Sequence, residues 1–264
     1  MPGRINNFPA ALAIACSFLT ALPTPSVEWT PSRLRYVPLA MPVAGAVVGT
    51  LGGLLFSALC FWDVSSMLRA AIMTFFYMAV TGGLHMDGFM DTCDAVFSRK
   101  GRRERLEILS DTHVGAFAVM GCGAVLMLKA GIFSELFARP APFTSYVVLT
   151  AAIPVYSRFG LGLLFFLPFA KEDGLARTLG SERVFSDRSV LWAGCALFGL
   201  AAAWAAGMKW LFVPFAGGAA LVFYGRYCVK KFGGVTGDLM GAYVELSETL
   251  MFLTIIIVEQ HGRI

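Results

Sequence analysis

The stretch 37-VPLAMPVAGAVVGTLGGLLFSALCFW-62 decides the fold, because it contains no charged side chain. About 20 predominantly apolar residues suffice for a helix to cross a bilayer. Six further blocks are apolar and long enough, and they lie on the C-terminal side of the first: 67–86, 114–138, 142–169, 189–207, 209–225 and 235–258. The last of these carries acidic residues inside its apolar run. The pattern predicts an all-α, polytopic integral membrane bundle of about six to eight membrane helices.

The composition supports this prediction. Of the 264 residues, 57% are hydrophobic and only 14% are charged, whereas a soluble domain has roughly 25% charged residues. A folded soluble chain of this size cannot bury that much apolar surface. The composition therefore excludes a soluble enzyme, a disordered chain and a nucleic-acid-binding protein. The unbroken apolar blocks also differ from the alternating strands of a membrane β-barrel. The six cysteines form no C-x-x-C pair, which is typical of packing residues.

The charged linkers predict the topology. Four linkers are basic, and the intervening linkers hold only Asp63, Arg139 and Lys209. The basic linkers are 28–35, 99–105, 171–188 and 226–231. If each block crosses once, all four lie on one side, and the positive-inside rule makes that side cytoplasmic. We therefore expect a multi-pass protein of the cytoplasmic (inner) membrane, with residues 1–264 forming a single membrane-embedded domain.

Two segments leave alternatives open. Residues 8–22 favour a short interfacial, re-entrant or marginally spanning helix over a signal sequence. Block 142–169 is longer than a typical span, so it is one tilted helix or two pieces broken near Pro154.

The densest polar cluster follows the second block. Asp87, Asp91 and Asp94 have the spacing i, i+4, i+7, which places them on one face of a helix. Ionised carboxylates this close repel one another, so a nearby cation is needed to keep all three ionised. Oxygen ligands without a thiolate favour Mg²⁺, and Asp111 is a candidate fourth ligand on the facing side. The alternative is a solvated acidic helix end that pairs with the arginines nearby.

The same region offers candidates for proton transfer. His85 and Asp111 are candidate general bases, although His85 is equally a packed core residue. The basic run 99–105 either gathers an anionic substrate or serves as a topology and lipid-headgroup anchor. No P-loop motif occurs, so a nucleotide is not bound in that way.

A second polar set lies in block 235–258. Asp238 and Glu245 share a face, and Gly237 with Gly241 forms a G-x-x-x-G that lets another helix approach closely. We expect this helix to pack against the aspartate helix. Asp238, Glu245 and the basic Lys129 and Arg158 of other blocks are candidate substrate-binding residues. The alternative is that the acids are buried against those two cations for structural reasons.

The residues resemble the cobalamin synthase family, the adenosylcobinamide-GDP ribazoletransferases. The resemblance rests on GGLHMDGFMDTCDAVFS (82–98), RLEILSDTHVGAF (105–117) and GGVTGDLMGAYVELSE (233–248). Phe18-Leu19-Thr20, Leu22-Pro23 and DGLARTLG (173–180) support it. One departure is Ala21, where the family usually has Arg. Any phosphate contact of that arginine would then be absent here or supplied elsewhere, for example by Arg33 or Arg35.

The resemblance implies the last assembly step of cobalamin synthesis. Adenosylcobinamide-GDP and alpha-ribazole, or its phosphate, would give adenosylcobalamin (phosphate) and GMP, with Mg²⁺ as cofactor. Matching positions imply that Asp87, Asp91, Asp94 and Asp111 form the metal site. Whether the chain forms homo-oligomers or associates with other corrinoid-pathway enzymes is left open.

Two rival functions remain at this stage. A CDP-alcohol phosphotransferase also uses membrane aspartates and a metal, but its D-x-x-D-G-x-x-A-R arrangement is missing here. A cation- or proton-coupled transporter would use Asp87, Asp238 and Glu245 as relay groups at the bilayer midplane. Transporters often have repeated halves, and the sequence shows no such repeat.

Overall fold

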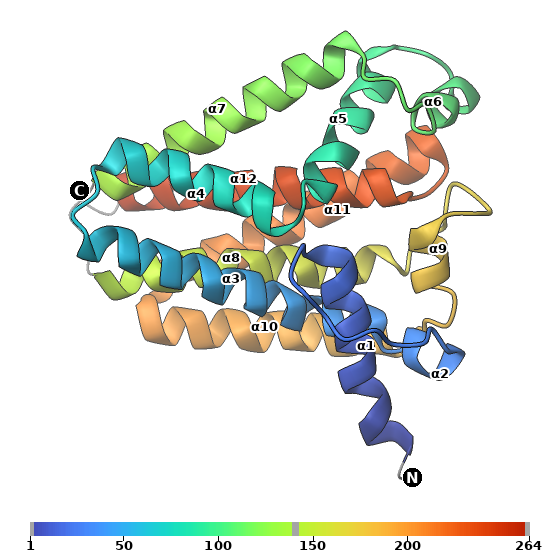
Figure 1. The fold of residues 1–264 in the computed structure, drawn as a ribbon, viewed down its shortest axis with the longest axis horizontal. Coiled ribbons are helices and arrows are strands. Elements are labelled where there is room, and N and C mark those ends of the chain that lie inside the picture. Colours follow the sequence, from blue (N-terminus) through green and yellow to red (C-terminus); the bar gives the residue numbers. More distant parts are fainter. Residues whose placement is uncertain (1–2, 139–142, 262–264) are drawn as a thin grey trace.

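The computed structural model describes residues 3–138 and 143–261 of the chain. These residues form helices and no named strand (Figure 1). The elements are α1 Gly3–Leu19, α2 Pro31–Leu34, α3 Val37–Phe61, α4 Ser66–Val80, α5 Leu84–Phe97, α6 Arg102–Ile108, α7 Ala116–Ala138, α8 Phe143–Leu164, α9 Leu175–Leu179, α10 Asp187–Ala206, the 3-10 helix Met208–Leu211, α11 Phe212–Phe232 and α12 Gly237–His261. The predicted all-α bundle is confirmed.

Within the described residues, four helices are long and apolar enough to cross a membrane: α3, α7, α11 and α12. The bent pair α4 and α5 makes a fifth span if it is counted as one. This number is lower than the six to eight predicted. Two further long helices, α8 and α10, have 22 and 20 residues; α8 packs along α3, and α10 packs against α8 (Figure 1). The polytopic helical membrane architecture is thus confirmed.

The predicted block 67–86 is broken. α4 begins after Ser65, whose hydroxyl accepts a hydrogen bond from the Leu68 backbone N–H at 3.4 Å. It ends at Val80, and Gly82 and Gly83 follow with φ values of 61° and 77°. Only glycine adopts this left-handed conformation without strain. The chain turns by 90° into α5, so the aspartates lie on a separate helix and not at the end of α4.

α8 is one continuous helix through Pro154, which decides between the two alternatives for block 142–169. Proline has no backbone N–H, so it leaves the carbonyl four residues earlier without its helical partner. That carbonyl belongs to Thr150, and the Tyr77 hydroxyl of α4 donates to it at 2.7 Å. Two glycines of α3, Gly45 and Gly49, let α3 lie directly against the α8 backbone near Pro154 and Ala151.

The N-terminal segment is a short helix, as predicted. α1 packs against α3 and runs at a steep angle to the long helices (Figure 1). Its described apolar part, residues 7–19, is shorter than a spanning helix.

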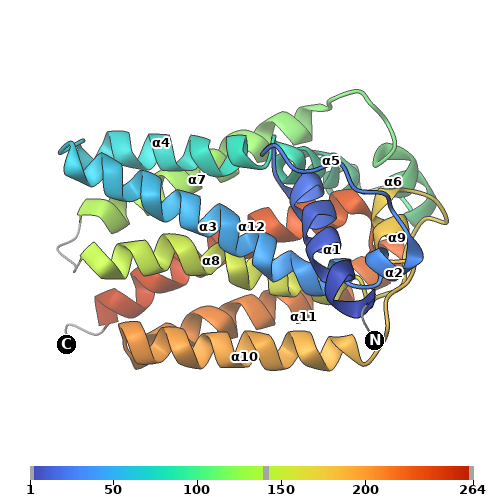
Figure 2. The ribbon, with the colours of Figure 1, turned by 60° about the horizontal axis from the view of Figure 1, so that its bottom comes forward.

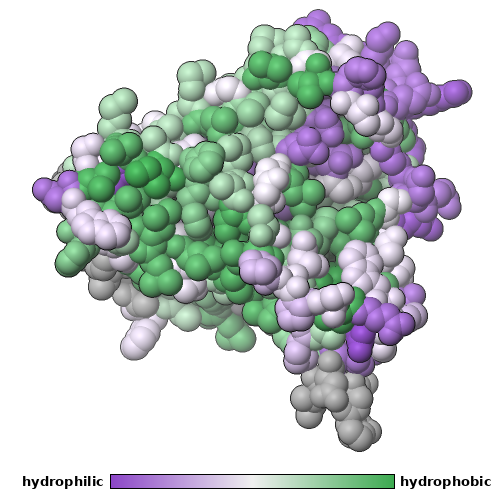
Figure 3. Space-filling model, viewed as in Figure 1, coloured by the Kyte–Doolittle hydropathy of each residue, from purple (hydrophilic) through white to green (hydrophobic). Residues whose placement is uncertain are grey.

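The four basic segments lie at one end of the bundle, although 226–231, which was predicted to be a linker, is the last part of helix α11. This end carries α2, α6, α9 and the turn between α11 and α12 (Figures 1 and 2). Hydrophilic residues gather along this end, whereas hydrophobic residues cover much of the rest of the visible face (Figure 3). The prediction that the basic linkers share one side is therefore confirmed, and we call this side the basic end.

Two buried ion pairs join α12 to neighbouring helices. Glu245 pairs with Lys129 of α7, and Glu248 pairs with Arg158 of α8. All four side chains are buried, and Ser157 donates a further hydrogen bond to Glu248 at 2.9 Å. A charge inside a bilayer requires such a partner. The pairs therefore fix the position of α12 against two neighbouring helices.

Removing one member of a buried pair should destabilise the fold strongly. Lys129→Met leaves the Glu245 carboxylate without its cation, and we expect the free energy of unfolding to fall by about 3–5 kcal/mol. Combining it with Glu245→Leu should restore most of the loss, because no unpaired charge remains. Unfolding in detergent micelles measures both. A Lys129→Met protein as stable as the wild type would contradict the assignment.

Candidate functional site

The site begins at the crossing of α5 and α12. A Cβ atom at Gly88 would lie 2.7 Å from the Asp238 carbonyl oxygen, and one at Gly241 would lie 3.2 Å from the His85 Cα atom. Only glycines allow backbones this close. The prediction that these two helices pack together is confirmed. Of the two glycines of the G-x-x-x-G motif, Gly241 lies at this contact. Gly237 instead faces Ala176 of α9, at 3.9 Å from its Cβ atom.

A short pairing of extended backbone fixes a third segment beside this crossing. Ala170 N–H donates to the Val235 carbonyl at 2.9 Å, and Val235 N–H donates to the Pro168 carbonyl at 2.8 Å. The segment after α8 is thereby tied to the residues that precede α12. This tie brings Lys171 to the start of α12, although 67 residues separate Lys171 from Asp238 in the sequence.

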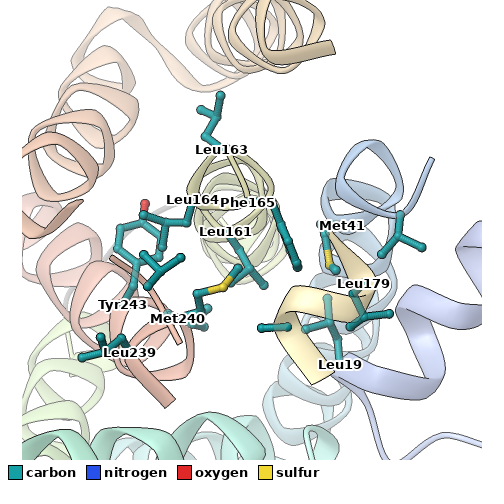
Figure 4. Packing of buried hydrophobic residues seen from close by; sticks show 14 of the residues in the cluster. Leu19, Met41, Leu161, Leu163, Leu164, Phe165, Leu179, Leu239, Met240 and Tyr243 are labelled. Atoms are coloured by element: carbon teal, nitrogen blue, oxygen red, sulfur yellow. The ribbon is translucent and has the colours of Figure 1, made fainter. Parts of the chain in front are cut away.

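The three segments enclose a cavity of about 220 Å³. Its polar lining combines acids, cations and a histidine: His85, Asp87, Lys171, Asp173, Arg177, Thr236 and Asp238. Its apolar wall includes Leu161 and Phe165 of the α8 end and Met240 of α12. These residues belong to the buried cluster that joins α8, α12, α1, α3 and α9 (Figure 4). A polar cavity therefore rests on a packed apolar floor at the basic end.

The acidic groups are close enough to interact. The Asp91 carboxylate experiences the charges of Asp87, Asp238 and Asp94, and Lys171 is the cation that opposes them. Asp238 likewise interacts with Lys171 and Asp87. Sequence analysis placed the α5 aspartates in one cluster and Asp238 in another, and the helix crossing joins Asp87, Asp91 and Asp238 into a single acidic group.

Asp94 has a structural task that the sequence analysis did not foresee. Its two carboxylate oxygens accept hydrogen bonds from Gly115 N–H at 2.8 Å and Ala118 N–H at 2.9 Å. These donors are unpaired backbone groups at the start of α7, where a carboxylate is favoured. Asp94 thus caps α7 from α5. With both oxygens engaged, it is the least available of the three α5 aspartates for a metal ion.

Asp111 lies in the exposed loop between α6 and α7. Its carboxylate accepts hydrogen bonds from the backbone N–H of His113, at 3.0 Å, and from the His113 ring. This pairing lowers the pKa of Asp111 and raises the pKa of His113. Asp111 lines neither this cavity nor the hollow described below. Its roles as metal ligand and general base stay predictions without geometric support.

The structure separates the remaining candidates. His85 is 2% exposed, lines the cavity, and its Nε2 atom has no hydrogen-bond partner among the described residues. Lys129, Arg158 and Glu245 belong to the buried pairs and do not line the cavity. The geometry therefore supports the alternative that these three side chains are buried in ion pairs that stabilise the fold. Their substrate-binding role stays a prediction.

The charged residues 171, 173 and 177 of the cavity were not predicted as site residues. Lys171 and Arg177 lie in a basic linker that predicts only topology, and no motif assigns a role to Asp173. The only signal was that DGLARTLG (173–180) is part of the family resemblance. By contrast, Arg33 donates to the Glu28 carbonyl and Arg35 stacks on Tyr36. Neither arginine lines the cavity. Neither therefore supplies, in this cavity, the phosphate contact of the arginine that the family usually has at the position of Ala21.

The acidic group suits a hard divalent cation by its chemistry. Among the described residues, no group of three or more His, Cys, Asp or Glu side chains is arranged so that it could hold a metal ion by itself. Mg²⁺ does not require such a cage, because it keeps several waters and commonly takes one or two carboxylates together with substrate phosphate oxygens. Asp87 and Asp238 line the cavity, and Asp91 lies one turn after Asp87 on α5. Their carboxylates are oxygen donors of the type that Mg²⁺ takes.

Fold and cavity together define a polytopic membrane protein with a mixed-charge site at the basic end of its helical bundle. The comparisons with known proteins make the assignment specific. Residues 11–256 match the family described as cobalamin-5-phosphate synthase, and the chain belongs to this family.

Relatives cover nearly the whole chain. An adenosylcobinamide-GDP ribazoletransferase of Geobacillus thermodenitrificans is 33% identical over 90% of this chain and 92% of its own length. Proteins with the same name from Desulfitobacterium hafniense and Escherichia coli are 33% and 31% identical, over 92% and 91% of this chain and 94% and 96% of their own lengths. No solved structure matches the chain.

The cap formed by Asp94 can be separated from metal binding by substitution. We expect Asp94→Ala to lower the free energy of unfolding by about 1–2 kcal/mol, because the α7 donors lose their acceptor. Asp94→Asn keeps one acceptor oxygen but places its NH2 group beside the second backbone donor, so it should retain only part of the stability. Chemical unfolding in detergent measures the difference, with the exposed Asp111→Ala as control. Equal losses for Asn and Ala would contradict the cap.

Proposed function

We propose that this chain is an adenosylcobinamide-GDP ribazoletransferase. It would join adenosylcobinamide-GDP to alpha-ribazole or alpha-ribazole phosphate and release GMP, in the last stage of cobalamin synthesis. Membership of the cobalamin-5-phosphate synthase family over residues 11–256 carries the proposal. The printed activity of relatives aligned over nine-tenths of the chain supports it.

The charges of the cavity support a diphosphate as the reacting group. Two acids, Asp87 and Asp238, and two cations, Lys171 and Arg177, line the same cavity. We propose that Asp87, Asp91 and Asp238 hold Mg²⁺, which would neutralise phosphate charge as the pyrophosphate bond breaks. The two cations would bind phosphate oxygens directly. Carboxylates alone would repel the substrate, so both kinds of charge are needed in one site.

The transfer also requires a group that accepts the proton of the attacking ribazole hydroxyl. His85 lines the cavity, and its Nε2 atom has no partner among the described side chains. A buried imidazole nitrogen that has no other partner is a candidate proton acceptor for a substrate in this cavity. We therefore assign the general-base role to His85 in preference to Asp111. The apolar wall of Leu161, Phe165 and Met240 would exclude water and so limit hydrolysis of the diphosphate.

Orientation follows from the basic end. The positive-inside rule places basic linkers in the cytoplasm, and the cavity lies at the same end as these linkers. We therefore propose a protein of the cytoplasmic membrane whose site faces the cytoplasm. Its nucleotide substrate would then enter from the compartment in which nucleotides are made.

A transporter is the alternative of a different class. It would need its relay acids along a path through the bilayer. Asp87 and Asp238 instead lie in the first turns of their helices at the basic end, whereas Glu245 is already paired with Lys129. This distribution favours catalysis at the membrane rim over transport.

The activity can be tested with purified protein in lipid nanodiscs. We expect GMP release from adenosylcobinamide-GDP only when alpha-ribazole or its phosphate is also present, together with Mg²⁺. Release without the ribazole acceptor would indicate a hydrolase, and no release under any condition would contradict the proposed function.

The metal assignment has its own test. Asp87→Asn removes a charged ligand, and we expect it to weaken apparent Mg²⁺ affinity by at least about tenfold while the protein remains folded. Titration of GMP release with Mg²⁺ measures this. Asp63→Asn is the matched control, because Asp63 lies in the turn between α3 and α4, at the opposite end of the bundle. An unchanged Mg²⁺ requirement in Asp87→Asn would contradict the role of Asp87.

A further inference from the structure

A second, more open hollow adjoins the cavity at the basic end. It has a volume of about 770 Å³ and is lined by Arg102, Arg103, Leu106, Glu107, Ser110 and Lys171. Five of these residues come from α6 and the turn that follows it, and Lys171 comes from the segment tied to α12. Nothing in the acidic site described above uses the α6 residues. The hollow is thus a separate feature with a predominantly cationic lining.

Three charges of α6 have ion-pair partners, within the helix or just before it. Arg103 pairs with Glu107 at 3.0 Å, and Lys100 pairs with Glu104 at 3.6 Å. Arg102 has no carboxylate partner among the described residues. Its guanidinium instead lies against Gly233, in the space that a side chain at that position would occupy. The turn between α11 and α12 therefore positions Arg102 without neutralising it.

Lys171 links the hollow to the cavity. It lines both of them, and its Nζ atom donates to the Ser110 hydroxyl at 2.7 Å. It is also the cation that opposes the charges of Asp91 and Asp238. An anion that spans the two spaces would therefore meet Lys171 at their boundary and Arg102 farther out.

We propose that this hollow binds the phosphate of a nucleotide substrate, with Arg102 and Lys171 as its two cationic contacts. The inference rests on the proposed function and adds a binding site to it. Two sources share this chemistry: the GMP portion of adenosylcobinamide-GDP and the phosphate of alpha-ribazole phosphate. Leu106 lines the same hollow and offers an apolar surface to the base or sugar next to that phosphate.

The test uses nucleotide binding, which does not require turnover. The full chain is placed in nanodiscs of zwitterionic lipid, and the binding of GMP and of alpha-ribazole phosphate is measured by calorimetry. Guanosine and alpha-ribazole, which lack the phosphate, are the ligand controls. Arg102→Gln and Lys171→Gln each remove one cation, and Lys230→Gln removes an exposed cation of α11 at the same end that lines neither space.

We expect each of the two site variants to weaken binding of one phosphorylated ligand by about tenfold or more, since a hydrogen bond to a charged group is lost. Lys230→Gln should bind as the wild type does, and the ligand affected identifies the source. Guanosine and alpha-ribazole should bind equally to all variants. Arg102 is exposed, so Arg102→Gln remains informative even if Lys171→Gln does not fold.

Unchanged affinity for both phosphorylated ligands in folded Arg102→Gln would overturn the proposal. So would an effect confined to nanodiscs with added phosphatidylglycerol, because Arg102 would then contact lipid headgroups. These outcomes differ from a failure of the proposed function, in which the wild type binds nucleotide but releases no GMP from adenosylcobinamide-GDP.

Discussion

The close crossing of α5 and α12 is the constraint on which the site depends. Gly88 and Gly241 let the two backbones touch, so that aspartates from segments about 150 residues apart share one electrostatic environment. A larger side chain at either glycine would push the helices apart and separate Asp87 and Asp91 from Asp238. Because no side chain separates the two helices at this contact, residues of both helices, such as Asp87 and Asp238, line the same cavity.

Other interactions hold this crossing in register. The left-handed glycines at 82 and 83 turn the chain by 90° and let α5 leave the direction of α4. The ion pairs of Glu245 and Glu248 hold α12 against α7 and α8. Asp94 ties the far part of α5 to the start of α7. Buried charges and caps thus position the acidic group, and the acids that remain beside the cavity are available for chemistry.

Sequence patterns predicted the helical membrane class, the grouping of basic linkers and the packing of the two acidic helices, because apolar length, charge bias and glycine spacing are local signals. The break after Val80 was only hinted at by Gly82 and Gly83. The cap by Asp94 and the place of Lys171 in the cavity depend on contacts between distant segments, which spacing does not encode. Helical spacing predicted that the three α5 aspartates lie near one another, but it could not predict that Asp94 would bind the start of α7 while Asp87 lines the cavity.

The most direct test of this account is Gly88→Ala, compared with Gly123→Ala on α7, where an added Cβ atom meets nothing within 4 Å. The measured quantities are the rate of GMP release and the apparent Mg²⁺ affinity in nanodiscs. The account predicts that Gly88→Ala lowers both, because its Cβ atom would meet the Asp238 backbone, whereas Gly123→Ala leaves both unchanged. Wild-type rate and Mg²⁺ affinity in Gly88→Ala would contradict it.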